Sequence, residues 1–172
     1  MTRILAFDTS MSSPGVAVIE IKRNKPHIVA TSHVTTAASQ PHGLRAEIVE
    51  AWATLFIAKH GAKFDAIVRE DFVGRTSRQN HPVYSAWGAI DQALNKFGLK
   101  VTQQPISQSK IKRLVTGSGS ATKDDVEQAV RELTGFDRKF ATDDESDAAA
   151  VALAWAIEQG LIKRKTKGAN KL

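Results

Sequence analysis

The sequence contains no cysteine among its 172 residues, and this absence excludes several kinds of site. Disulfide bonds, zinc sites with thiolate ligands and cysteine nucleophiles are all ruled out, and a reducing compartment fits the composition. Long apolar runs are also missing. The first apolar run, in MTRILAFDTS, is interrupted by Asp8 and is too short for a signal peptide or a membrane span. We therefore expect a cytoplasmic protein that makes no membrane contact.

The length and charge of the chain favour one domain with a polyanionic partner. The chain can bury one sizeable core, is short for two domains, and contains no internal repeat. We expect a single domain over residues 1–160 and a basic, flexible tail at 161–172. Lys and Arg together number 24 against 18 Asp and Glu, which gives a formal net charge of +6. This excess favours a polyanion, although a solvated tail explains part of it equally well.

The distribution of apolar residues predicts five strands and five helices. Short β-branched runs separated by turn residues predict a three-stranded antiparallel meander at the start. Apolar residues at three- and four-residue steps predict helices further along. In chain order the expected elements are strands at 3–8, 15–21 and 27–34, a helix at 41–60, a strand at 65–70, a helix at 82–97, a strand at 99–104, and helices at about 107–115, 122–134 and 145–160.

This order of elements predicts an α/β fold with a five-stranded mixed sheet flanked by helices. Right-handed crossovers through the first two helices would make the last two strands parallel to the first strand. The ribonuclease H-like fold and the actin-like ATPase domains share this order. Topology alone therefore leaves both folds open, and the acidic residues must distinguish them.

Four acidic residues occupy positions that converge in the predicted fold. Asp8 ends the first strand and Glu70 ends the fourth, which should lie beside it and run parallel to it. Carboxylates at the ends of apolar strands are costly to bury unless they are paired or bind a cation. Asp144 and Asp147 lie three residues apart at the start of the last helix, a spacing that points both toward one face. The sequence thus predicts a cluster of carboxylates at one edge of the sheet.

The chemistry of this cluster indicates a site for hard divalent cations. Oxygen ligands without cysteine or clustered histidine suit Mg²⁺ or Mn²⁺ better than zinc. Two such ions, about 4 Å apart, can support phosphodiester hydrolysis. Asp71, Asp143 and Glu145 are close by in sequence, so the identity of the fourth ligand stays open.

Each acid taken singly also has a structural explanation. Asp144 could cap the last helix, with Asp147 as its capping-box partner. Glu70 could pair with a neighbouring arginine such as Arg69, and Asp8 could cap the turn that follows it. The joint placement of all four residues favours the metal site over these separate explanations.

The sequence resembles the RuvC-type Holliday junction resolvases over almost its entire length. ILAFDTSMSSPGVAVIE resembles the opening strand, turn and strand of that family with its catalytic Asp. IVREDF resembles the strand that carries the catalytic Glu, and DESDAAAVALA resembles the final helix with its paired acids. The most specific match is SKIKRLVTGSGSATKDDVEQAVRELTG, which is similar to the family's V-K…V-x-G-x-G-x-A-x-K-x-x-V segment.

The resemblance implies a function and a set of site residues. The implied activity is the resolution of Holliday junctions by paired symmetric nicks, performed by a homodimer with Mg²⁺, for which Mn²⁺ should substitute. The metal-binding catalytic acids would be Asp8, Glu70, Asp144 and Asp147, and the lysines on DNA phosphates would be Lys112 and Lys123. A helicase partner is not determined by the sequence.

The glycine-rich segment has a physical basis for binding phosphate. Gly117 and Gly119 permit a tight loop whose backbone N–H groups can face an anion, and Lys123 follows in the first turn of a helix. Thr122 and Asp125 form the capping-box pattern of that helix. A helix–turn–helix packed in the core, with solvated lysines, is the structural alternative.

Five further residues are candidates for DNA contacts. Arg113 and Lys110 are included by their proximity to Lys112. Arg75 and Arg78 belong to the segment GRTSRQNH, which could follow a phosphate backbone or be an ordinary surface loop. Phe72 is the candidate for an aromatic residue that the family inserts at the junction, although it is offset by one position and could belong to the core.

The helix predicted at 82–97 is the expected dimer interface. Its apolar residues include Trp87 and Ile90, which could equally serve the core of the domain.

Three other functions remain open at the level of sequence. One is a broader structure-specific endonuclease that cuts flaps or forks. Another is a nucleotide-binding actin-like protein, which would require a second, duplicated domain. The last is a non-catalytic DNA-binding module whose acids serve as helix caps.

Overall fold

The computed structural model describes residues 1–71 and 76–164, apart from the side chains of residues 77–79. The strands are β1 (Thr2–Asp8), β2 (Gly15–Lys22), β3 (Lys25–His33), β4 (Ala66–Asp71) and β5 (Ile106–Ser107). The helices are α1 (His42–His60), α2 (Ser77–Asn95), α3 (Gln108–Thr116), α4 (Lys123–Thr134) and α5 (Asp143–Glu158). Within the described ranges, no helix has the length and apolar character needed to cross a membrane.

The strands form one mixed sheet in the order β3-β2-β1-β4-β5. β1 pairs with β2, and β2 with β3, in antiparallel fashion, whereas β4 runs parallel to both β1 and β5. This arrangement confirms the expected meander and the five-stranded mixed sheet. It also places the carboxyl ends of β1 and β4 next to each other.

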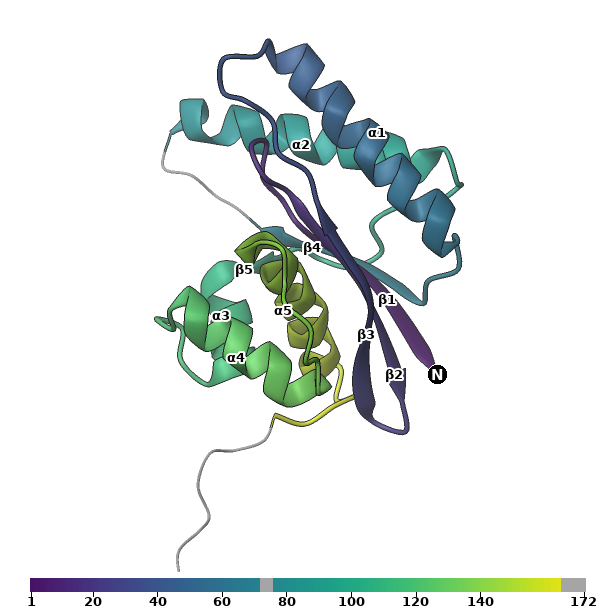
Figure 1. Cartoon of the computed structure of the whole chain (residues 1–172), viewed down its shortest axis with the longest axis vertical. Coiled ribbons are helices and arrows are strands. Elements are labelled where there is room, and N and C mark those ends of the chain that lie inside the picture. Colours follow the sequence, from purple (N-terminus) through teal and green to yellow (C-terminus); the bar gives the residue numbers. More distant parts are fainter. Residues whose placement is uncertain (72–75, 165–172) are drawn as a thin grey trace, which may run out of the picture.

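Helices cover both faces of the sheet, with α1 and α2 on one side and α3, α4 and α5 on the other (Figure 1). Successive residues of a strand point to opposite faces. Leu5 and Phe7 of β1 accordingly pack into the core under α1 and α2, while Ile4 and Ala6 pack into the core under α5. The alternation directs the next residue, Asp8, to the side of α5.

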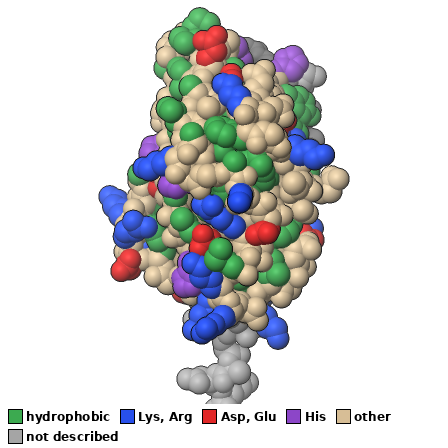
Figure 2. Space-filling model, turned by 90° about the vertical axis from the view of Figure 1, so that its right-hand side faces the viewer, with side chains coloured by type: hydrophobic (Ala, Val, Ile, Leu, Met, Phe, Trp, Pro, Cys, Tyr) green, Lys and Arg blue, Asp and Glu red, His purple; other side chains and the backbone are tan. Residues whose placement is uncertain are grey.

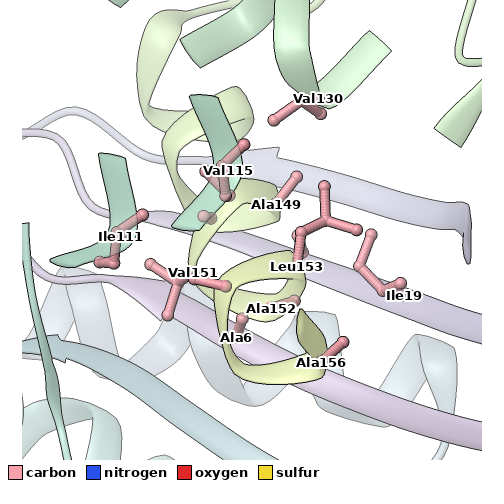
Figure 3. Packing of buried hydrophobic residues seen from close by; sticks show 14 of the residues in the cluster. Ala6, Ile19, Ile111, Val115, Val130, Ala149, Val151, Ala152, Leu153 and Ala156 are labelled. Carbon is pink, nitrogen blue, oxygen red and sulfur yellow. The ribbon is translucent and has the colours of Figure 1, made fainter. Parts of the chain in front are cut away.

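The helix α5 is buried along most of its length against the sheet. Its alanines meet small side chains of the strands, such as Ala6, and this allows the helix axis to approach the sheet closely. Figure 3 shows Leu153 of α5 between the sheet residue Ile19 and the neighbouring helices. Truncating a fully buried leucine such as Leu153 to alanine typically costs about 2–5 kcal/mol. The packing fixes the position of the first turn of α5 over the ends of β1 and β4.

The fifth strand is not where the sequence predicted it. Residues 99–104 form no strand, and β5 is the two-residue segment Ile106–Ser107. The N–H of Thr102 donates to the carbonyl of Ile67, but the N–H of Ile67 donates to the hydroxyl of Thr102 rather than to a carbonyl. Pro105 then supplies no N–H. A side chain thus replaces the backbone ladder, and regular pairing with β4 begins only at Ile106.

The helix expected at 82–97 begins earlier, at Ser77, and ends at Asn95. The spacing of apolar residues predicted a start at Pro82, yet Pro82 lies inside the helix. Ile90 is fully buried, which confirms the alternative that this residue serves the core.

Candidate active site

Asp8 and Glu70 meet at the ends of two neighbouring parallel strands. Phe7 pairs with Arg69 in the register of β1 and β4, so the two acids that follow them lie side by side. Their carboxyl groups lie within hydrogen-bonding reach of each other. On the other edge of β4, Glu70 pairs with Ile106 of β5. The end of β4 is therefore held between β1 and the two-residue strand β5.

A hydrogen bond between two carboxyl groups requires a proton, and the surroundings of the pair favour retaining it. Burial raises the pKa of Asp8 well above its usual range, and the neighbouring Glu70 and Asp144 raise this pKa further. Burial also raises the pKa of Glu70, despite the opposing effects of Asp8 and Lys112. Two adjacent ionised carboxylates are therefore unfavourable here unless a positive charge compensates them.

The first turn of α5 brings two more acids to this pair. Burial, followed by the charge of Asp8, raises the pKa of Asp147 to about 6. Asp144 acts on both Asp8 and Asp147 through its charge. The N-cap of α5 is Thr142, without a side-chain cap hydrogen bond, so the alternative in which Asp144 caps the helix is wrong.

Two lysines converge on the same cluster. The ammonium nitrogen of Lys123 lies 3.5 Å from Oδ2 of Asp143 and 3.7 Å from Oδ2 of Asp147. The charge of Lys112 lowers the pKa of Glu70, which places this side chain within electrostatic range of the cluster. The two lysines come from α3 and α4, the helices that flank the glycine-rich segment. The site thus combines buried and half-buried acids with lysines that lie near them.

The residues present fit a divalent cation. As the side chains lie, no three His, Cys, Asp or Glu of residues 1–71 and 76–164 are close enough together to hold an ion. The donor set nevertheless consists of carboxylates, which Mg²⁺ and Mn²⁺ prefer. A cation would also offset the cost of ionising Asp8 and Glu70, whose pKa values are raised by burial and by the charges of neighbouring acids. The acids would have to draw closer together to form such a site.

Glu145, one of the alternative fourth ligands, is engaged elsewhere. Its side chain is only 7% exposed and accepts hydrogen bonds from the hydroxyl of Thr31 (2.9 Å) and the N–H of Ala141 (3.2 Å). It also lies 3.0 Å from Nδ1 of His33. Glu145 therefore ties the start of α5 to β3, and it does not face the cluster. Asp143 is a largely exposed partner of Lys123.

The alternative in which Arg69 pairs with Glu70 is wrong. The Arg69 guanidinium is 3.1 Å from Oδ1 of Asp91 and stacks over the ring of Trp87, at 4.1 Å from the ring centroid. Both partners belong to α2, on the opposite face of the sheet. The alternation of β4 thus separates Arg69 from the carboxylate next to it in sequence.

The glycine-rich segment forms the predicted capped turn. The side chain of Thr122 accepts from the N–H of Asp125, and the side chain of Asp125 accepts from the N–H of Thr122, which confirms the capping box. Gly117 ends α3 with φ of +97°, a left-handed conformation that favours glycine.

Two of the remaining candidates for DNA contacts, Lys110 and Arg113, lie on α3. Arg113 is exposed in the last turn of α3. Lys110 pairs with Glu158 at the far end of α5, about 20 Å along the helix from its first turn. Phe72, Arg75 and the side chain of Arg78 lie outside the described residues.

Two contacts that hold the first turn of α5 were not predicted from the sequence. Ser13 donates to Asp144, and Glu145 anchors the same helical turn. Both contacts join segments more than a hundred residues apart, and no local pattern in the sequence indicates them.

Comparison with known proteins identifies relatives across nearly the whole chain. The family model for crossover junction endodeoxyribonuclease RuvC matches residues 4–155. The RuvC of Synechococcus sp. (strain WH7803) is 31% identical over 151 residues, which cover 88% of this chain and 96% of that protein. The RuvC of Heliobacterium modesticaldum is 31% identical over 153 residues, covering 89% and 93% of the two chains.

Solved structures share the architecture. Thermus thermophilus RuvC in complex with its Holliday junction substrate has a TM-score of 0.79 at 23% identity, and the match covers 95% of this chain and 99% of that one. The yeast mitochondrial Holliday junction resolvase Ydc2 has a TM-score of 0.61 at 13% identity, with 93% and 80% coverage. These likenesses confirm the ribonuclease H-like fold. Together with the family model, they establish that this chain belongs to the crossover junction endodeoxyribonuclease RuvC family.

Proposed function

We propose that this protein resolves Holliday junctions by paired symmetric nicks, through metal-dependent hydrolysis of phosphodiester bonds. The observation that carries the proposal is the pair of the buried Asp8 and the half-buried Glu70, with the half-buried Asp147 facing it from α5. Three carboxyl groups with raised pKa values are costly in a purely structural role, because burial and the charge of a neighbouring acid both disfavour the ionisation of each group. Membership of the resolvase family supports the same activity.

We further propose that Asp8, Glu70, Asp144 and Asp147 hold Mg²⁺, with Mn²⁺ as a substitute. A divalent cation bound there supplies the activation of water and the neutralisation of phosphate charge that hydrolysis requires. The protein contributes the placement of the ligands. The strands β1 and β4 fix Asp8 and Glu70 side by side, and the buried helix α5 holds the other two acids above them.

Lys112 and Lys123 are proposed to hold the phosphate at the cleavage site. Both act on the acidic cluster electrostatically, so a phosphate that contacts them would lie next to the carboxylates. Arg113, exposed on α3, would contact the neighbouring backbone. On the face shown in Figure 2, Lys and Arg side chains are interspersed with hydrophobic and acidic ones. The net charge alone therefore does not locate the DNA, and the proposal rests on the position of the two lysines beside the acids.

We propose that the other candidate residues contact DNA farther from the cleavage site. Lys110, engaged by Glu158 at the far end of α5, would meet DNA only beyond the cleavage site. Arg75 and Arg78 are proposed to follow a phosphate backbone, and Phe72 to insert at the junction. The roles of Arg75 and Arg78 rest on the basic character of the segment GRTSRQNH, and the role of Phe72 rests on the family resemblance.

A four-way junction requires two cuts, so we propose a homodimer with one active site per protomer. The proposed interface is the exposed side of α2, where Tyr84 is 51% exposed and its ring contacts the edge of Trp87. Because the substrate is DNA, we also propose a cytoplasmic location. Light scattering of the purified protein and cell fractionation test these two points.

The activity is tested with three labelled substrates, namely a four-way junction, a forked duplex and a linear duplex, each with Mg²⁺. We expect paired nicks at symmetric positions of the junction and no cutting of the linear duplex. Equal cutting of the fork would replace the proposal with a broader branched-DNA endonuclease. Absence of cutting on all three substrates would contradict the proposed activity.

A further inference from the structure

The carboxylate of Asp144 is held by a hydroxyl from the opposite end of the chain. Oγ of Ser13 donates to Oδ2 of Asp144 at 2.6 Å. This length is typical of a strong hydrogen bond from a hydroxyl to an ionised carboxylate. Ser13 belongs to the turn between β1 and β2, directly after the strand that carries Asp8. The same hairpin therefore carries one acid of the cluster, Asp8, and donates a hydrogen bond to another, Asp144.

The turn that carries Ser13 is internally ordered. Oγ of Ser10 accepts hydrogen bonds from the N–H groups of Ser12 (3.1 Å) and Ser13 (3.3 Å). The carbonyl of Ser12 accepts from the N–H of Thr36 at 2.8 Å, in the segment that follows β3. These bonds fix the backbone of Ser13 relative to the sheet.

A buried arginine anchors the turn from the side of α1. Arg45 is only 6% exposed, and its guanidinium donates to the hydroxyl of Ser12 (2.8 Å) and to that of Thr36 (2.9 Å). Thr36 in turn donates to the carbonyl of Met11 at 2.6 Å. A buried charge must be hydrogen-bonded to be tolerated, so these contacts are needed by Arg45 as well as by the turn. The turn is thus connected rigidly to the helical layer on the far face of the sheet.

The backbone of Asp144 is fitted to the same hairpin. A Cβ atom on Gly15 would lie 2.0 Å from the carbonyl oxygen of Asp144, so this position accommodates only glycine as the structure stands. Both the main chain and the side chain of Asp144 are therefore positioned by residues 13–15.

We propose that Ser13 is a positioning residue, which orients the carboxylate of Asp144 toward the divalent cation. The proposal rests on the metal site of the proposed function. Oδ2 of Asp144 receives the Ser13 hydroxyl, and this leaves Oδ1 and the remaining lone pair of Oδ2 for a cation. Carboxylate ligands of metals are generally oriented by such hydrogen bonds, and loss of an orienting partner typically weakens metal affinity by about 10- to 100-fold.

The test compares Ser13→Ala and Ser13→Thr with the control Thr54→Ala. Thr54 lies in α1, and its hydroxyl donates to the carbonyl of Glu50 within that helix at 2.8 Å. Mn²⁺ binding is measured by calorimetry on each full-length protein, together with the Mg²⁺ dependence of junction nicking, junction affinity in EDTA, and the melting temperature in EDTA.

Ser13→Ala should weaken Mn²⁺ binding by about 10-fold or more, and should raise the half-activating Mg²⁺ concentration by a similar factor. Its junction affinity and its melting temperature in EDTA should stay close to wild type. Ser13→Thr, which keeps the hydroxyl, should recover most of the Mn²⁺ affinity, and Thr54→Ala should match wild type.

The proposal would be overturned if Ser13→Ala bound Mn²⁺ as tightly as the wild type does. It would also be overturned if Ser13→Thr bound Mn²⁺ as weakly as Ser13→Ala, or if the wild type bound no Mn²⁺. The proposed function is judged separately by junction nicking in the wild type. A protein that nicks junctions with Ser13→Ala unaffected keeps its function and loses the positioning role. If Ser13→Ala loses Mn²⁺ affinity but the wild type does not nick junctions, the positioning role of Ser13 is kept and the proposed function is lost.

Discussion

The carboxyl groups of Asp8 and Glu70 lie within hydrogen-bonding reach of each other at the adjacent ends of β1 and β4. The contact joins two residues that are distant in sequence and brings them together on the face of α5. Asp147 lies close to this pair. We therefore expect the protonation of the cluster, the binding of a cation and the stability of the fold to depend on one another.

The first prediction concerns the pH dependence of stability without metal. The folded state raises the pKa of Asp8, Glu70 and Asp147, the last from 3.8 to about 6, so it binds these protons more tightly than the unfolded chain does. The stabilisation is complete below the unfolded pKa values near 4, and is lost as the pH rises through the folded values. A cation that binds the ionised carboxylates should offset this loss of stability. Mg²⁺ should therefore raise the melting temperature more at about pH 8 than at about pH 5.

Thermal unfolding in EDTA and in saturating Mg²⁺ at the two pH values measures this difference. Asp147→Asn should reduce it, because the variant lacks one of the titrating groups. An equal increase in melting temperature at both pH values would show that Mg²⁺ does not compete with protons at this cluster.

The second prediction concerns the phosphate contacts of Lys112 and Lys123. Each substitution to alanine should weaken junction binding and should lower the slope of log K against log salt concentration by about one. Lys22→Ala is the matched control, since Lys22 pairs with Glu20 at the end of β2 that lies about 20 Å from Gly15. Binding is measured in EDTA over a salt series. Unchanged slopes for Lys112→Ala and Lys123→Ala would place the phosphates elsewhere.

The third prediction concerns the fit between the β1–β2 hairpin and α5. Gly15→Ala should destabilise the protein by about 1–3 kcal/mol, because the new methyl group would collide with the backbone of Asp144. Gly88→Ala, at a helical position of α2 with no atom within 4 Å of the added carbon, should instead stabilise by about 0.5–1 kcal/mol. Denaturant unfolding measures both variants. A Gly15→Ala protein as stable as wild type would mean that α5 does not lie against the hairpin as described.

The parts of the site that the sequence predicted are those encoded by short periodic patterns. Asp8 and Glu70 end apolar strands, and their convergence follows from parallel pairing of those strands. Asp144 and Asp147 are brought to one face by the spacing of a helix. The capping box of Thr122 is likewise a local pattern, and the structure confirms it.

The parts that could not be predicted depend on contacts between distant segments. The bond from Ser13 to Asp144 spans 131 residues, and the bond from Thr31 to Glu145 spans 114. No periodicity in either segment signals the partner. The misplaced fifth strand has a related cause, because the hydroxyl of Thr102 takes a hydrogen bond that a regular strand would have given to a carbonyl.

The most direct test of the central claim is junction nicking by the wild type, Asp8→Asn and the control Asp137→Asn, which changes an exposed acid of the segment after α4. With Mg²⁺, the wild type and Asp137→Asn should cut at symmetric sites. The cutting rate of Asp8→Asn should fall by more than about 100-fold, because loss of a metal ligand should cost more than loss of a residue that only orients a ligand. Asp8→Asn should still bind the junction, and EDTA should abolish cutting. Cutting that survives both EDTA and Asp8→Asn would contradict the claim that the carboxylate cluster is a metal-dependent active site.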